Sequence, residues 1–203
     1  MSEIVRPCVY FERPGKKNTA RVVEVVMERL NVGDIMTVVV ASTTGYTALK
    51  FAEALEARGG TPPVRLISIA EGALIREWGA EYPSLKAEDK QELERRGVVV
   101  ADRVAHLLHC SLLDYSEWKF PGPEEMVRET LYAFGQGLKV AVEVALMAVA
   151  CGFLEPFQKV IAVGGTSRGA DTAIVARATY PNHFFSKEKE KRFVIYEILC
   201  KPL

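Results

Sequence analysis

Residues 35–49 read IMTVVVASTTGYTAL, and this stretch carries the strongest fold signal in the chain. Residues 35–41 are almost entirely apolar, which predicts a buried strand, and the residues from Ala48 onward predict a helix. A strand that turns directly into a helix is the unit from which parallel sheets are built. The turn between the two consists of Ser42, Thr43, Thr44, Gly45, Tyr46 and Thr47.

This turn also predicts a binding site. Its four hydroxyl side chains and its glycine stand where the helix begins, beside free backbone N–H groups at the positive end of a helix dipole. Such a point attracts an anion, most often the phosphate group of a ligand. The alternative is that Ser42 or Thr43 only caps the helix, as serine and threonine commonly do.

The alternation of strand and helix continues on both sides of this stretch. Apolar runs predict strands at 7–11, 64–69, 98–100, 160–163 and 193–199, and helical spacing predicts helices at 18–30, 48–58, 86–96, 124–134 and 138–152. Residues 173–178 fit a strand or a helix, and residues 74–78 fit a helical turn. We expect one α/β domain over 1–203, with three layers (α/β/α) and a mostly parallel, doubly wound sheet that has an antiparallel edge strand.

Composition narrows the function. Lys and Arg total 26, as do Asp and Glu, so no basic field predicts a nucleic acid or an anionic membrane as partner. The most apolar stretch, 140–154, is too short to span a bilayer and includes Glu143. The four cysteines form no CxxC pair and the three histidines show no zinc-ligand spacing, so we expect reduced thiols, a cytoplasmic protein and no metal site.

A second loop, 164–172, reads GGTSRGADT. Its glycines let the backbone approach a ligand closely, and Arg168 offers a planar cation suited to phosphate. Both loops follow apolar strands, and the carboxyl ends of parallel strands share one edge, so we expect one ligand between 42–47 and 164–172. The second loop lacks the GxGxxG spacing of dinucleotide sites. The predicted ligand residues are Gly164, Gly165, Thr166, Arg168, Gly169, Ala170, Asp171 and Thr172.

The apolar helix at 138–152 carries two charged side chains four residues apart, Lys139 and Glu143. They share one face, so they either form a buried ion pair or face the ligand together with Gln136. Asp171 would repel a phosphate, so we expect it to orient Arg168 or to accept hydrogen bonds from N–H groups of its loop. His106 is the histidine with the best claim to line a site.

Both loops resemble the C-terminal domain of pyruvate kinase, in which such elements hold the phosphate of an allosteric sugar bisphosphate. Residues 42–48 look like its hydroxyl turn and 169–175 like its late glycine loop, which favours a strand at 173–178. The whole chain more closely resembles a family of stand-alone pyruvate kinase C-terminal-like proteins, through 11–15 with Asn18 and Thr19, 134–143, and 164–172. It departs from that family's pattern at 101–110.

This resemblance implies a phosphate site, and some family members look able to hold flavin mononucleotide (FMN). We therefore expect a phosphorylated cofactor or metabolite, with FMN as the specific candidate and flavin-dependent redox chemistry if the protein is an enzyme. Pyruvate kinase activity is not expected, because the catalytic barrel belongs to other domains of that enzyme. The alternatives are a non-catalytic module that senses a sugar phosphate or nucleotide through oligomerisation, and flavin bound adventitiously.

A flavin ring would also need an aromatic wall, for which the sequence offers Phe11, Tyr46, Trp118 and Phe134. The aromatic-rich segment 102–137 is either a lid or subunit contact, which would make the protein a homo-oligomer, or a hydrophobic cluster under a loop.

Overall fold

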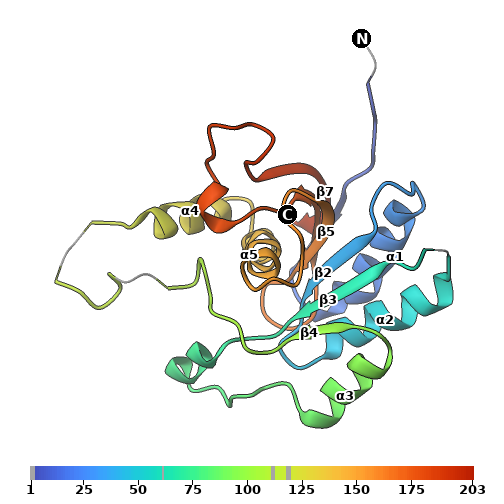
Figure 1. The fold of residues 1–203 in the computed structure, drawn as a ribbon, viewed down its shortest axis with the longest axis horizontal. Helices are drawn as coiled ribbons and strands as arrows, with labels where there is room; N and C mark the ends of the chain where they lie inside the picture. Colours follow the sequence, from blue (N-terminus) through green and yellow to red (C-terminus); the bar gives the residue numbers. More distant parts are fainter. Residues whose placement is uncertain (1–2, 61, 111–112, 118–119) are drawn as a thin grey trace.

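The computed structural model describes residues 3–60, 62–110, 113–117 and 120–203. Its centre is a seven-stranded sheet in the order β1-β7-β6-β5-β2-β3-β4 (Figure 1). The strands are β1 (Val9–Phe11), β2 (Thr37–Ala41), β3 (Arg65–Ile69), β4 (Val99–Ala101), β5 (Lys159–Gly164), β6 (Thr172–Arg177) and β7 (Val194–Pro202). Strands from the two ends of the chain, β1 and β7, pair with each other.

Every neighbouring pair of strands is parallel except the two pairs that include β6. The expected class, a mostly parallel α/β sheet with an antiparallel element, is therefore confirmed. The antiparallel strand β6 lies third from the β1 edge, between β5 and β7. Its small and β-branched residues are buried from Thr172 to Ala176, which suits a central strand covered on both faces and resolves the choice between strand and helix there.

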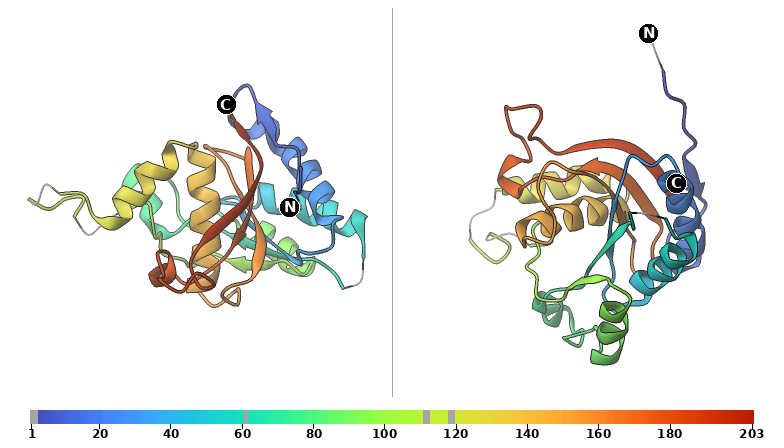
Figure 2. Two further views of the ribbon diagram at one scale, coloured as in Figure 1. Left: turned by 90° about the horizontal axis from the view of Figure 1, so that it is seen from above. Right: turned by 45° about the vertical axis from the view of Figure 1, so that its right-hand side comes forward.

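Helices cover both faces of the sheet, and the layers separate clearly in two views (Figure 2). One face is covered by α1 (Thr19–Leu30), α2 (Tyr46–Arg58) and α3 (Ala87–Arg95), and the other by α5 (Gln136–Ala150) with α4 (Pro123–Tyr132) packed beside it. A core lies on each side, with Phe51 central to the first and Val142 to the second. The described residues also form three 3-10 helices, η1 (Lys16–Asn18), η2 (Ala73–Trp78) and η3 (Pro181–His183).

Glycines end the predicted helices where a left-handed backbone is required. Gly33 has φ +81° just beyond α1, and its N–H donates to the Leu30 carbonyl at 3.0 Å. Residues 74–78 form part of η2, as the helical-turn interpretation predicted.

The expected aromatic excursion has no helix or strand in the described part of 102–122. Tyr115 is 94% exposed there, so this side chain takes no part in a buried cluster. Trp118, one of the predicted ring walls, lies outside the described residues.

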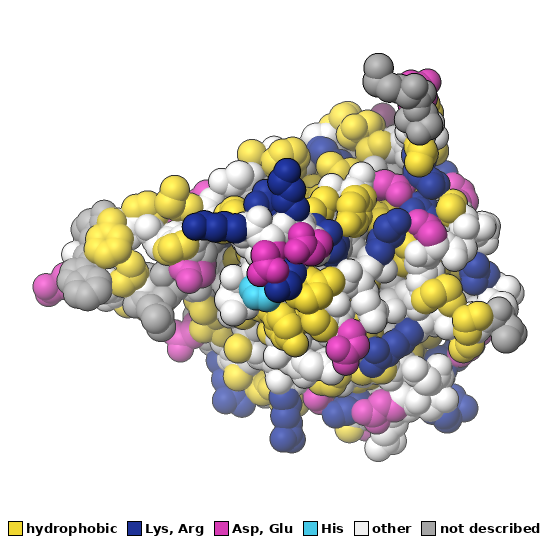
Figure 3. Space-filling model, turned by 45° about the horizontal axis from the view of Figure 1, so that its top comes forward, with side chains coloured by type: hydrophobic (Ala, Val, Ile, Leu, Met, Phe, Trp, Pro, Cys, Tyr) yellow, Lys and Arg dark blue, Asp and Glu magenta, His cyan; other side chains and the backbone are white. Residues whose placement is uncertain are grey.

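Two bulk expectations can be examined on the structure. Among the described helices, none combines the length and apolar character needed to cross a bilayer. Acidic and basic side chains are interspersed on the face seen in Figure 3, as the balanced composition leads one to expect.

The first turn of α5 packs against the 164–172 loop, which we call the glycine loop, and this packing can be tested. A Cβ on Gly137 would lie 2.2 Å from the Thr172 Oγ1 and 2.4 Å from the Asp171 Oδ1. Helix propensity alone predicts that Gly137→Ala gains about 1 kcal/mol. We expect a net loss of stability instead, measured by urea unfolding, because overpacking costs about 1–3 kcal/mol. The exposed Ala150→Gly variant is the control and should show the ordinary propensity loss; a stabilised Gly137→Ala variant would contradict this packing.

Candidate functional site

The two predicted loops lie side by side at the carboxyl edge of the sheet. Strands β2 and β5 are parallel neighbours, with Val38 opposite Ile161, so both loops leave the same edge. Lys16 joins them: its Nζ lies 4.1 Å from the centroid of the Tyr46 ring, and its backbone packs against Gly169. The convergence expected from the sequence is therefore present, and Lys16 is a cation at this edge that the motifs did not indicate.

In the 42–47 turn, which we call the hydroxyl turn, the Ser42 side chain stabilises the protein itself. Its buried Oγ accepts a hydrogen bond from the Ala48 N–H in the first turn of α2 at 3.1 Å, although the N-cap residue of this helix is Gly45. Ser42 therefore takes up one free N–H group at the start of the helix, as the capping alternative expects. Thr47 is also buried, whereas Thr43 is half-buried and Thr44 is exposed. Within this turn, the threonine pair is thus the part that a ligand can reach.

The glycine loop approaches the start of α1 closely. Gly169 has φ +73°, and a Cβ there would lie 2.4 Å from the Thr19 Oγ1. The Thr19 hydroxyl oxygen accepts from the Ala170 N–H at 3.0 Å. At the tip of the loop Arg168 is exposed, and it forms no hydrogen bond or ion pair within the described part of the chain. Its guanidinium is therefore available to an anion.

Asp171 is fully buried beneath the loops of this edge. Its Oδ2 accepts from the backbone N–H groups of Gly15 at 2.9 Å and Thr166 at 3.1 Å, and its Oδ1 accepts from the Thr172 hydroxyl at 2.9 Å. The interpretation in which this carboxylate holds loop N–H groups is confirmed. Its assignment as a ligand contact stays a prediction, and a ligand would meet a carboxylate that already accepts from three groups of the protein. Because the Thr172 hydroxyl group donates its proton to Asp171, that proton is not available to a ligand.

The start of α5 meets the glycine loop, because Gly164 packs against the Gly137 carbonyl. Gln136 is exposed at the first position of this helix. One turn further, Lys139 and Glu143 form an ion pair of 2.9 Å, with side chains 0% and 4% exposed. The buried ion-pair interpretation is therefore confirmed.

The carboxylate of Glu143 is held from several sides. Its Oε1 accepts from the backbone N–H groups of Leu107 at 3.0 Å and Leu108 at 2.8 Å. Burial alone would raise the pKa of this carboxyl group, but the Lys139 ammonium and the Leu108 N–H outweigh burial, so the pKa of Glu143 is lowered. Glu143 is thus a buried anion that fixes the loop after β4 onto α5.

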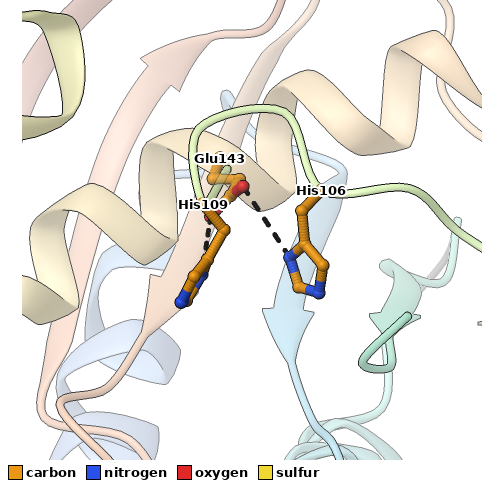
Figure 4. A group of neighbouring side chains, drawn as sticks. All are labelled: His106, His109 and Glu143. Carbon is orange, nitrogen blue, oxygen red and sulfur yellow. Dashed lines mark ion pairs between the residues drawn. The ribbon is translucent and has the colours of Figure 1, made fainter. Parts of the chain in front are cut away.

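That loop brings two histidines to the ion pair (Figure 4). The Nδ1 atoms of His106 and His109 lie 3.8 Å and 4.0 Å from carboxylate oxygens of Glu143. Lys139 Nζ lies 3.1 Å from the His109 Nδ1. Burial first, and the Lys139 ammonium second, lower the pKa of His109, so its ring is neutral at neutral pH.

Two more residues complete this cluster: Glu71, just after β3, and Trp78, at the end of η2. Glu71 Oε2 lies 2.9 Å from the His106 Nε2, yet the two groups are not aligned for a hydrogen bond, and both atoms are buried without one in the described structure. The Trp78 ring lies 4.6 Å from the His109 ring. We call Glu71, Trp78, His106, His109, Lys139 and Glu143 the histidine cluster.

Three ligating atoms of this cluster, from His106, His109 and Glu143, lie within 4.8 Å of one another, although their spacing in the sequence predicted no metal site. The position between them is already held by a cation, because Lys139 Nζ contacts both the His109 Nδ1 and the Glu143 Oε2. Lys139 is completely buried, so its ammonium is held among these partners and not in solvent. The cluster therefore carries its own positive charge in the place a metal ion would take.

An open pocket of about 460 Å³ lies at the opposite, amino edge, beside Arg29 and Lys159. The Arg29 guanidinium there bonds to Asp34 at 2.6 Å and to Glu197 at 2.8 Å. Because carboxylates of the protein already saturate this cation, the pocket has little to offer an anionic ligand.

No model of a known protein family matches this sequence. The likeness to pyruvate kinase C-terminal-like proteins therefore stays a prediction from the residues themselves.

The role of Lys139 can be tested by removing its charge. Lys139→Met leaves a buried unpaired carboxylate, which should cost about 3–5 kcal/mol, and opens the cation position to Zn²⁺. We expect Zn²⁺ to raise the melting temperature of Lys139→Met but not of the wild type. The control is Lys159→Met, which removes an exposed ion pair and should cost at most about 1 kcal/mol. Equal stabilisation of the wild type by Zn²⁺ would contradict a lysine-filled site.

The lowered pKa of His109 predicts a loss of stability in acid. Between this lowered value and the ordinary value of 6.5, the unfolded chain binds more protons than the folded one, so stability falls as pH falls through that window. One group contributes at most about 1.4 kcal/mol per pH unit. Urea unfolding from about pH 7.5 to about pH 5 should show a shallower slope for His109→Asn than for the wild type. An equal pH dependence of stability in the two proteins would contradict the lowered pKa of His109.

Proposed function

We propose that this protein binds a phosphorylated small molecule between the 42–47 turn and the 164–172 loop. The observation that carries the proposal is that α1, α2 and α5 all begin against these two loops, through Thr19, Tyr46 and Gly137. Three positive helix ends, together with the side chains of Lys16 and Arg168, favour a dianion at this edge.

The roles within this site follow from accessibility. Arg168 would bind phosphate oxygens through two N–H groups, while Thr43 and Thr44 would donate from the turn. Gly165 and Gly169 let the loop backbone come close; a Cβ on Gly165 would lie 2.3 Å from the Gly169 carbonyl oxygen. Ser42, Asp171 and Thr172 support the two loops from beneath.

FMN is the specific ligand we propose, on the resemblance to pyruvate kinase C-terminal-like proteins. Of the predicted ring walls, Phe11 packs on the first core, the Tyr46 ring is covered by Lys16, and Phe134 is 50% exposed. Trp78, 52% exposed beside His109, is an accessible aromatic surface that the sequence interpretation missed. FMN, when bound, would supply redox chemistry that these side chains do not.

One observation favours the second candidate, a non-catalytic module that senses a sugar phosphate or nucleotide. The accessible side chains of the two loops are hydroxyl groups and one guanidinium, which bind anions but offer no general base near neutral pH. Sensing would then act through oligomerisation. Flavin bound adventitiously in a site meant for another phosphate is the third candidate.

We place this function in the cytoplasm, as part of the same proposal. The thiols of Cys8, Cys110, Cys151 and Cys200 are all free, which fits a reducing compartment.

The shared phosphate site is tested by Arg168→Ala combined with Thr44→Val. Each substitution removes a hydrogen bond to a charged group, so affinity for FMN and for sugar phosphates should fall together, by about 100-fold or more. Titration calorimetry measures both ligands, and Arg65→Ala with Thr130→Val, at exposed positions outside the two loops, is the control pair. Unchanged affinity in the double variant would show that these loops do not form the site.

The ligand itself is identified by colour and by stability. Protein purified yellow, with flavin absorbance that bleaches reversibly on reduction, supports FMN. Colourless protein that is stabilised by sugar phosphates but not by FMN excludes flavin and supports the sensing module. Yellow protein that exchanges FMN for a sugar phosphate of higher affinity supports adventitious binding.

A further inference from the structure

The histidine cluster lies on the same edge as the proposed phosphate site, but the phosphate does not explain it. Its residues come from the segment after β3, the loop after β4 and the first turns of α5. Both histidines face Glu143 (Figure 4), and Glu71 lies beside His106. The cluster holds five ionisable side chains, whereas one ion pair would suffice to hold the loop.

The contact between Lys139 and His109 fixes the form of the imidazole. A lysine ammonium can only donate, so the His109 Nδ1, at 3.1 Å from it, must accept and carries no proton. The lowered pKa of His109 makes the ring neutral. We therefore assign the single ring proton to Nε2, which has no hydrogen-bond partner within the described part of the chain, in a side chain 28% exposed.

The neighbours of His109 hold this ring in place. The Trp78 ring lies against it at 4.6 Å and the His106 ring meets it edge-on at 5.1 Å. From α4, Arg128 donates to the His109 carbonyl oxygen at 3.3 Å. Because Glu143 is tied to two backbone N–H groups and to Lys139, the donor that points at Nδ1 is itself fixed.

The second histidine, His106, is held in a close buried contact. Its side chain is 7% exposed, and its Nε2 lies 2.9 Å from the Glu71 Oε2, although the two groups are not aligned for a hydrogen bond. This contact and the edge-on packing of the two imidazole rings hold His106 beside His109.

The charge of the cluster selects the kind of acceptor. Two carboxylates, Glu71 and Glu143, lie in this cluster with one ammonium, Lys139, and the neutral His109 ring adds no charge. These carboxylates would repel a second phosphate or a carboxylate of the ligand. A neutral oxygen with free lone pairs is accepted, and a carbonyl oxygen is the strongest common one.

We propose that His109 donates its Nε2–H to a carbonyl oxygen of the ligand, with Lys139 and Glu143 as positioning residues. This inference rests on the proposed phosphate site, since it names the other end of the same ligand. The class is a phosphorylated compound that bears a carbonyl group, which includes both the ring dione of FMN and an open-chain keto sugar phosphate. The Lys139 charge behind the ring strengthens the donor.

The first test reads the proton directly and needs no ligand. Long-range ¹H–¹⁵N spectra of the wild-type protein near neutral pH, with His109→Phe to assign the signal, should show the Nε2–H form of a neutral ring. An Nδ1–H form or a charged imidazolium overturns the inference, because His109 would then not be the locked donor.

The second test compares ligands that share a phosphate. Dihydroxyacetone phosphate has a carbonyl group where glycerol 3-phosphate has an alcohol group. FMN and inorganic phosphate are the other two ligands. We expect His109→Phe to weaken the carbonyl ligands by about five- to tenfold and to leave glycerol 3-phosphate and inorganic phosphate unchanged. The control is His183→Phe, because His183 lies in η3, which follows the end of β6 beside the start of β5, at the opposite, amino edge of the sheet.

The outcomes separate this inference from the proposed function. A fall in affinity of the His109→Phe variant for FMN alone identifies the flavin dione as the acceptor. A fall in affinity for dihydroxyacetone phosphate alone identifies an open-chain carbonyl as the acceptor. Equal weakening of all four ligands, or of none, overturns the role of His109 while leaving the phosphate site intact. If the wild type binds none of the four, the phosphate site fails and this inference fails with it.

Discussion

The carboxylate of Asp171 is the constraint on which the carboxyl edge depends. It joins two backbone segments far apart in the chain, at Gly15 and Thr166, and it lies against the start of α5 at Gly137. A buried carboxylate is costly unless N–H groups surround it, so the loops must close around it together. The position of η1, the shape of the glycine loop and the start of α5 are consequences of satisfying one charge.

The two halves of this edge differ in electrostatic character. Helix N-termini, Lys16 and Arg168 make the β2–β5 half positive. The histidine cluster, over the ends of β3 and β4, contains the carboxylates of Glu71 and Glu143 and holds the Lys139 ammonium out of solvent. A ligand that spans both halves must itself be polarised, with its anionic group at one end and neutral oxygen acceptors at the other. Such a division selects ligands by shape and charge together, which neither half could do alone.

How much of this was readable from sequence depends on the range of each interaction. The strand at 35–41 and its turn are local signals, and the edge shared by both loops follows from parallel strands, so these were predicted. Ser42 shows the limit, because capping and ligand binding use the same residue type. The histidine cluster was missed because His109 and Lys139 are 30 residues apart and their meeting depends on how the loop after β4 folds over α5. Spacing rules recognise ligands on one element, whereas this cluster is assembled from three. The sequence did single out His106 and the pair of Lys139 and Glu143, and Glu71 and His106 each follow the end of a predicted strand, but no spacing rule joined these residues.

The pairing of β1 with β7 has a consequence for how the protein is made. Among the described strands, β1 lies at the edge of the sheet and pairs with β7 alone, so the first of these strands to be synthesised has no partner until the last one emerges. The β2–β3–β4 part of the sheet can form during synthesis, while the segment that supplies Gly15 and Lys16 must wait. The carboxyl edge is therefore completed last, and a chain that lacks β7 would hold a largely formed sheet in which this edge is incomplete.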